Sequence, residues 1–242
     1  MAIRIDPNAI VQSVTVEDDT LKFKTPATMC ISGPSMSGKS EFILKLIQHR
    51  ELLFDVQFDQ IFYCEPETLV LRHNLIFEKI KEVFPRAQLI IGLPDVTRLG
   101  LNLDNRPKLL IIDDLMSEFL SAQSMVHLLS VQVHHFNITT IFTLQNFFAH
   151  SKFGKTMSRN VTYRVLFYNR LDLTEIRTIS SQICHQPKFL LEIFEFLSDT
   201  FPHEPSYVVI DGHILSPLKE LFVRSHIFPN NNEIKPIFFF PD

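Results

Sequence analysis

The sequence predicts an α/β fold in which a parallel β-sheet is covered by helices on both faces. Continuous apolar runs alternate along the chain with stretches of helical periodicity, and such runs are typical of strands buried on both sides. The chain has 242 residues, of which 45% are hydrophobic, enough for one large core. We expect an α/β core over 26–215, an N-terminal β-hairpin extension over 1–25 and a C-terminal tail over 216–242.

The elements can be placed in order from these patterns. Residues 10–25 alternate apolar and polar positions around an acidic turn, which indicates the β-hairpin. The stretch 93–107 contains Pro, Gly and Asn and is expected to be a loop. Strands are predicted at 27–31, 58–64, 88–92, 109–112, 138–144, 161–167 and 207–210. Helices are predicted at 39–48, 67–84, 121–133 and 172–184.

A phosphate-binding loop lies between the first core strand and the first helix. The residues Gly33-Pro34-Ser35-Met36-Ser37-Gly38-Lys39-Ser40 match G-x-x-x-x-G-K-[ST] at every fixed position. Glycines let successive N–H groups turn toward phosphate oxygens, and the N-terminus of the next helix favours the same anion. Lys39 would reach the β- and γ-phosphates, and the Ser40 hydroxyl would ligate Mg²⁺. A glycine-rich turn before an ordinary helix is the alternative, but the strand and helix that flank the motif favour binding of ATP or a related triphosphate.

Two aspartates follow the apolar strand 109–112. Carboxylates at the C-terminal end of a strand lie in the crevice where α/β sheets hold ligands. Asp113 would hold Mg²⁺ opposite Ser40, and Asp114 would orient the water that attacks the γ-phosphate. A pair of turn or cap aspartates is the alternative, which the intact phosphate loop disfavours.

The next strand ends in Gln145-Asn146. Gln145 is our candidate sensor of the γ-phosphate, because an amide can donate to phosphate and accept from water. The alternative is a helix cap, a role for which Asn146 is better suited. Other phosphate-loop classes fit less well. There is no L-S-G-G-Q signature, and Asn169-Arg170-Leu171-Asp172 misses the guanine pattern N-K-x-D by one residue.

Charge and cysteine usage limit the possible partners and the compartment. The formal net charge is −4, so the whole chain has no basic signature for nucleic acid. From 119 to 171, however, there is no Asp or Glu. This stretch would present a trans-acting arginine to a neighbouring subunit, contact a polyanion, or form an ordinary solvated face. Its basic residues are Lys152, Lys155, Arg159, Arg164 and Arg170. Three separated cysteines and the lack of a membrane-length apolar run predict a soluble intracellular protein.

The motifs together resemble the genome-packaging ATPases of the FtsK–HerA superfamily, in the poxvirus-type branch that includes Maverick (Polinton) and adintovirus-like elements. The phosphate loop is common to many families, and the strand that leads from His-His-x-Asn into Gln-Asn is more specific. The segments that carry the resemblance are 33–40, 110–116, 134–139, 144–146 and 165–170.

The resemblance implies a RecA-like ATPase core of the ASCE class with parallel sheet order 5-1-4-3-2. It further implies a homo-oligomeric ring that uses ATP and Mg²⁺ to move double-stranded DNA into a capsid, with capsid proteins as further partners and a location in the host cytoplasm or nucleus or with the virion. Lys39, Asp114 and Gln145 would be catalytic. The family often has an Arg-Asp pair after the fifth strand, which Leu171 splits here, so Arg159 and Arg170 are both candidates for the trans-acting arginine.

Two other functions fit the same motifs. An ATP-gated oligomeric scaffold would need the nucleotide site but no translocation. A domesticated transposon gene would use the same ATPase site for a host task.

Overall fold

The computed structural model describes residues 21–70, 75–101, 103–147, 159–214, 223–229, 236–239 and 241. In these residues one mixed β-sheet has nine strands in the order β3-β2-β4-β5-β1-β6-β7-β8-β9. The first six strands in this order, β3, β2, β4, β5, β1 and β6, run parallel. The strands β7, β8 and β9 extend the sheet, each antiparallel to its neighbours. The predicted fold class is therefore confirmed, with the central order β6-β1-β5-β4-β2 corresponding to 5-1-4-3-2.

The strands are β1 (Thr28–Ser32), β2 (Gln60–Glu65), β3 (Gln88–Ile91), β4 (Lys108–Ile112), β5 (Ile138–Leu144), β6 (Tyr163–Phe167), β7 (Tyr207–Asp211), β8 (Val223–Ser225) and β9 (Ile237–Phe238). The helices are α1 (Lys39–Gln48), α2 (Arg50–Leu53), α3 (Glu67–Val70), α4 (Leu75–Val83), α5 (Met116–Ser121), α6 (Gln123–His127), the π-helix η1 (Leu128–Gln132), α7 (Val133–His135), α9 (Leu173–Cys184) and α10 (Phe189–Thr200).

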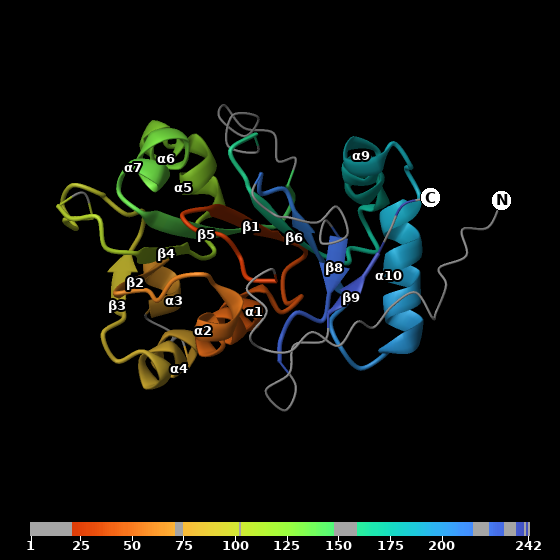
Figure 1. Ribbon diagram of the computed structural model, residues 1–242, viewed down its shortest axis with the longest axis horizontal. Helices are drawn as coiled ribbons and strands as arrows, with labels where there is room; N and C mark the ends of the chain where they lie inside the picture. The colour runs from red at the N-terminus through yellow and green to blue at the C-terminus, as the bar shows by residue number, and fades with distance from the viewer. Residues whose placement is uncertain are drawn as a thin grey trace.

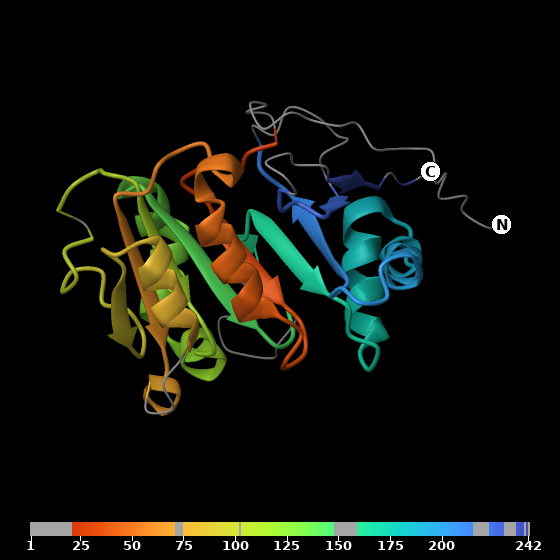
Figure 2. The same ribbon diagram turned by 90° about the horizontal axis from the view of Figure 1, so that it is seen from below.

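Helices cover both faces of the sheet, as Figure 1 shows with α1 to α4 below the strands and α5 to α7 above them. Two hydrophobic clusters lie on the two faces, and alternate residues of each strand enter one or the other. In β4, Leu109 and Ile111 belong to the cluster that includes residues of α1 and α4. Leu110 and Ile112 belong to the other cluster, which includes residues of α5 to α7, α9 and α10. Figure 2 looks onto the face that α1 and α4 cover. We call this the α1 face.

The described residues of the two terminal segments contact the core. The alternating stretch 10–25 lies mostly outside the described residues, but Phe23 is buried and forms a bridge with Phe54. In the expected tail, β8 pairs with β7, and β9 pairs with β8. Within 216–242, residues 223–225 and 237–238 therefore add two short strands to the sheet of the core.

Local sequence explains where the elements that carry the candidate site begin. Helix α1 starts after Gly38, whose φ of 98° is a left-handed conformation that glycine adopts without strain. Helix α9 starts after Asp172, whose carboxylate accepts the N–H of Glu175 as an N-cap. Both caps lie at the C-terminal edge of the parallel strands, where the phosphate loop also lies.

Candidate nucleotide site

A cavity of about 330 Å³ opens at the C-terminal ends of β1, β4 and β5. Its volume is within the range of small-ligand sites. The cavity is bounded by the phosphate loop, by the two aspartates after β4 and by the end of β5. The residues that line it are Ser35, Met36, Gly38, Lys39, Ser40, Glu41, Asp113, Asp114, Thr143 and Gln145. Residues far apart in sequence, including most of those predicted from the motifs, thus meet in one place.

Gly33 allows the phosphate loop to pack closely against β6. A Cβ on Gly33 would lie 2.6 Å from the Cβ of Phe167 on β6, a distance that real Cβ atoms do not reach. The carbonyls of Gly33 and Pro34 each accept a hydrogen bond of 2.8 Å from the Lys39 ammonium. Burial lowers the pKa of Lys39, and the charges of Asp113 and Asp114 partly oppose that effect. A triphosphate on the loop would compete for the same ammonium.

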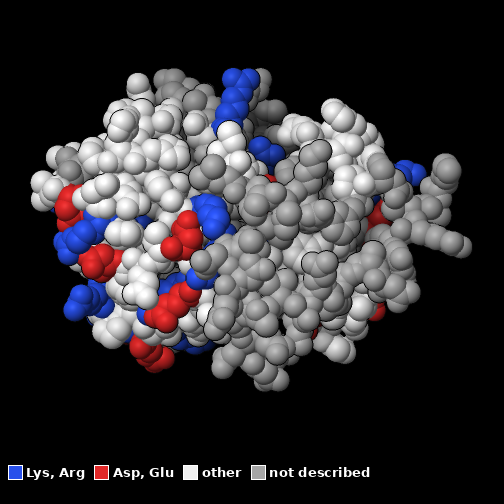
Figure 3. Space-filling model, in the orientation of Figure 1, with Lys and Arg blue, Asp and Glu red and all other residues white. Residues whose placement is uncertain are grey.

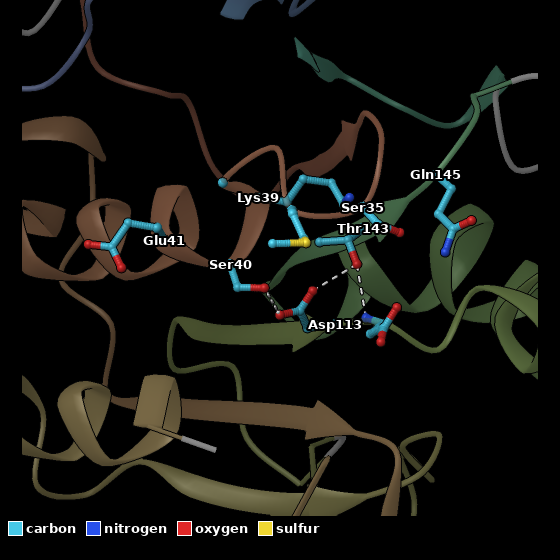
Figure 4. A pocket seen from close by; sticks show the side chains of 10 residues that line it. Ser35, Lys39, Ser40, Glu41, Asp113, Thr143 and Gln145 are labelled. Carbon is cyan, nitrogen blue, oxygen red and sulfur yellow. Dashed lines mark hydrogen bonds between the residues drawn. The ribbon is translucent and has the colours of Figure 1, made fainter. Parts of the chain in front are cut away.

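Ser40 and Asp113 lie in direct contact, as Figure 4 shows. The Ser40 hydroxyl donates to Asp113 Oδ2 at 2.7 Å, and the Asp113 side chain is buried. These are oxygen ligands of the kind that Mg²⁺ takes, and Mg²⁺ ordinarily completes its shell with water and substrate phosphates. The donor set therefore fits a nucleotide-bound Mg²⁺, which would neutralise charge on the β- and γ-phosphates. Glu41 points away from this pair.

Asp114 and Gln145 lie at the exposed side of the cavity. Asp114 has a left-handed backbone with φ of 54°, and its N–H donates to the Thr143 hydroxyl at 2.9 Å. Desolvation by the surrounding protein raises the pKa of Asp114 above its ordinary value, and the charge of Asp113 adds to this effect. The side chain of Gln145 extends toward the same cavity in Figure 4. A carboxylate and an amide on this side suit the positioning of a water molecule.

Asn146 has a structural partner, which distinguishes it from Gln145. Its side-chain N–H donates to Asp172 Oδ2 at 2.7 Å, while Asp172 Oδ1 caps α9. The Asp172 carboxylate is therefore engaged within the protein. This geometry does not suit the guanine-reading role of the last residue in N-K-x-D.

The two candidate trans-acting arginines lie outside the cavity lining. Both side chains are exposed, and Arg170 lies over the ring of Tyr168 at 5.9 Å. Arg164 instead is half-buried over the ring of Phe147 at 4.8 Å, so it has a packing role. Lys152 and Lys155 lie outside the described residues. Figure 3 shows mixed charges over α1 to α4 and few charged side chains over α5 to α7.

Sequence reasoning missed two residues that contact Asp113. The hydroxyls of Tyr63 and Thr143 donate to its carboxylate at 2.6 and 2.8 Å. A usable signal existed, since each lies near the C-terminal end of a strand predicted to neighbour the aspartate strand.

Comparison with solved structures finds likenesses in fold at low sequence identity. The packaging NTPase B204 from Sulfolobus turreted icosahedral virus 2, in complex with AMP, is 15% identical, with 83% of this chain and 96% of that chain covered and a TM-score of 0.49. The DNA-packaging ATPase B204 from Sulfolobus turreted icosahedral virus is 15% identical, with 76% of this chain and 92% of that chain covered and a TM-score of 0.48. A KaiC-like protein from Pyrococcus horikoshii is 14% identical, with 95% of this chain and 100% of that chain covered and a TM-score of 0.47. No protein-family model and no curated protein sequence matches the chain.

Within the described residues, no helix is both long enough and apolar enough to cross a membrane.

Proposed function

We propose that this chain is a Mg²⁺-dependent ATPase that works as a homo-oligomeric ring and moves double-stranded DNA into a viral or transposon-derived capsid. The observation that carries the ATPase part is the contact between Ser40 and Asp113. The Ser40 hydroxyl at the end of the phosphate loop lies 2.7 Å from the carboxylate after β4, so both halves of a magnesium–triphosphate site meet there. The DNA-packaging part, including the poxvirus-type branch and a location in the host cytoplasm or nucleus or with the virion, rests on the resemblance of the sequence motifs.

The roles of the residues follow from their positions. Amides of the phosphate loop and Lys39 bind the phosphates, while Ser40 and Asp113 hold Mg²⁺. Asp114 orients the attacking water, and Gln145 contacts both that water and the γ-phosphate. Arg159 or Arg170 of one subunit compensates charge at the site of the next, since neither lines the cavity of its own chain.

A hydrolysis assay with and without DNA tests the proposal. Phosphate release by the full chain is measured at low and at physiological salt, with linear double-stranded DNA of several lengths and with single-stranded DNA of the same sequence. We expect double-stranded DNA to stimulate hydrolysis, and salt to weaken the effect, because phosphate contacts release counterions. Displacement of a triplex-forming strand from the duplex then reports movement along DNA.

Asp114→Asn is the matched control because it keeps the size of the side chain and removes its charge. It should bind ATP and DNA but not hydrolyse ATP. Equal hydrolysis with and without DNA, together with no DNA binding, would refute the motor. ATP-dependent oligomers whose function survives Asp114→Asn would identify a scaffold instead.

A further inference from the structure

Three neighbouring strands deliver side chains to the same point on the α1 face. The order β2-β4-β5 places these strands side by side, and Ile61, Ile111 and Ile141 all pack in the cluster of that face. Because side chains alternate between the faces of a sheet, Tyr63 and Thr143, two residues further along, point to the α1 face as well. Asp113 follows β4 at the same level as Thr143, since Ile111 pairs with Ile141.

The carboxylate of Asp113 accepts three hydroxyl donors in this arrangement. Ser40 and Tyr63 donate to Oδ2 at 2.7 and 2.6 Å, and Thr143 donates to Oδ1 at 2.8 Å. Tyr63 and Thr143 are both buried, so these charge-assisted bonds form away from solvent. When Ser40 turns its oxygen to Mg²⁺, Tyr63 and Thr143 remain to fix the orientation of the carboxylate.

The hydroxyl of Thr143 has two partners, one on each aspartate. A hydroxyl has one hydrogen to donate and lone pairs to accept with. The hydrogen of Thr143 goes to Asp113, and the oxygen accepts the N–H of Asp114 at 2.9 Å. Asp114 has φ of 54°, a conformation that a residue with a side chain holds only when its surroundings support it. Thr143 thus connects the orientation of both aspartates.

We propose that Tyr63 and Thr143 are both positioning residues. Tyr63 sets the geometry of Asp113 and thereby the affinity for Mg²⁺. Thr143 sets Asp113 and also the backbone of Asp114, so that metal binding and placement of the attacking water are coupled through one hydroxyl. This inference rests on the proposed ATPase function and deepens it.

Two measurements on the full chain separate the roles. The first is the Mg²⁺ dependence of binding of a fluorescent, non-hydrolysable ATP analogue, and the second is kcat at saturating Mg²⁺. Tyr63→Phe should raise the Mg²⁺ concentration for half-maximal binding about tenfold, the loss expected for one hydrogen bond to a charged group. Thr143→Val should raise it similarly and lower kcat by at least tenfold, more than Tyr63→Phe does. Thr143→Ser keeps the hydroxyl and should restore both values to within about threefold of the wild type.

Thr140→Val is the control for the substitution itself. Thr140 is fully buried on the same strand, and its hydroxyl lacks a hydrogen-bond partner within the described residues. This variant should match the wild type in both measurements. Urea unfolding without nucleotide, run on each variant, separates loss of fold from loss of positioning.

The outcomes distinguish this inference from the proposed function. If Thr143→Val changes only the Mg²⁺ requirement, or if Thr143→Ser fails to restore kcat, the coupling through Thr143 is refuted. If neither Tyr63→Phe nor Thr143→Val changes the Mg²⁺ requirement, the positioning roles are refuted. If the wild type binds no Mg²⁺–nucleotide, the proposed ATPase function fails first. Hydrolysis without any response to DNA would refute the motor and leave the positioning roles standing.

Discussion

The pH dependence of folding should reveal a buried carboxyl group next to the end of β5. Glu175 lies in the first turn of α9, is 7% exposed and accepts the backbone N–H of Phe147. Burial raises the pKa of Glu175 from 4.5 to about 7, while the bond from Phe147 opposes the shift and the charge of Asp172 adds to it. We predict that Glu175→Gln removes a pH-dependent part of the free energy of unfolding.

The sign and size follow from proton linkage. Between pH 4.5 and about 7 the folded protein binds this proton more tightly than the unfolded chain, so stability falls as pH rises through that window. A difference of one pKa unit corresponds to about 1.4 kcal/mol, which gives a loss of about 2 to 3 kcal/mol between pH 5 and pH 8 as an upper bound. Glutamine keeps an acceptor for Phe147 but carries no charge at either pH. The stability of Glu175→Gln relative to wild type should therefore increase by this amount from pH 5 to pH 8.

Urea unfolding at several pH values, without nucleotide, measures the effect. The difference between variant and wild type cancels the histidines and other groups that titrate in both proteins. Glu195→Gln, at an exposed position of α10, is the matched control for replacement of a helical glutamate by glutamine. A Glu175→Gln curve that runs parallel to the wild-type curve across this range would show that Glu175 ionises normally and would refute the reasoning.

The other predictions concern the phosphate loop and the arginines. Lys39→Ala should weaken ATP binding about 10- to 100-fold by calorimetry, because a charged donor to the phosphates is lost. Gly33→Ala should lower the free energy of unfolding by about 2 kcal/mol or more through the 2.6 Å clash with β6. Gly92→Ala, which has φ of 80° and open space around it, should cost about 1 kcal/mol. Arg159→Ala or Arg170→Ala should lower turnover but not ATP affinity, and mixing with Lys39→Ala protein should restore turnover only for the arginine that acts in trans. Unchanged turnover in both arginine variants would exclude them from that role.

The parts of the fold that the sequence predicts well are those with local signals. The strands β1, β4 and β5 are apolar runs that end in the motif residues, and each is buried along its whole length. The phosphate loop is a continuous segment, 33–40, so its residue types alone indicate its geometry. Parallel strands share one C-terminal edge, and for this reason the aspartates and Gln145 could be placed beside the loop in advance.

The parts that the sequence did not reveal depend on distant partners. Helix α10, at Phe189–Thr200, was missed although its buried residues Phe189, Leu190, Ile193, Phe194 and Leu197 follow helical spacing. The strands β8 and β9 are short and exist through pairing with β7 and with each other. For the hydroxyl donors to Asp113, the sequence indicated their place near the ends of neighbouring strands, but the contact itself also depends on strand register, which a single sequence does not give.

The end of β5 divides its residues between the candidate site and the opposite face of the sheet. Thr143 and Gln145 line the cavity, whereas Asn146 and Phe147 bind Asp172 and Glu175 at the start of α9. Residues that face the cavity and residues that hold the start of α9 therefore follow one another directly in the chain. The turn before α9 also carries the exposed Arg170. The end of β5 thus supplies one wall of the cavity and the contacts that hold the start of α9 with a single stretch of chain.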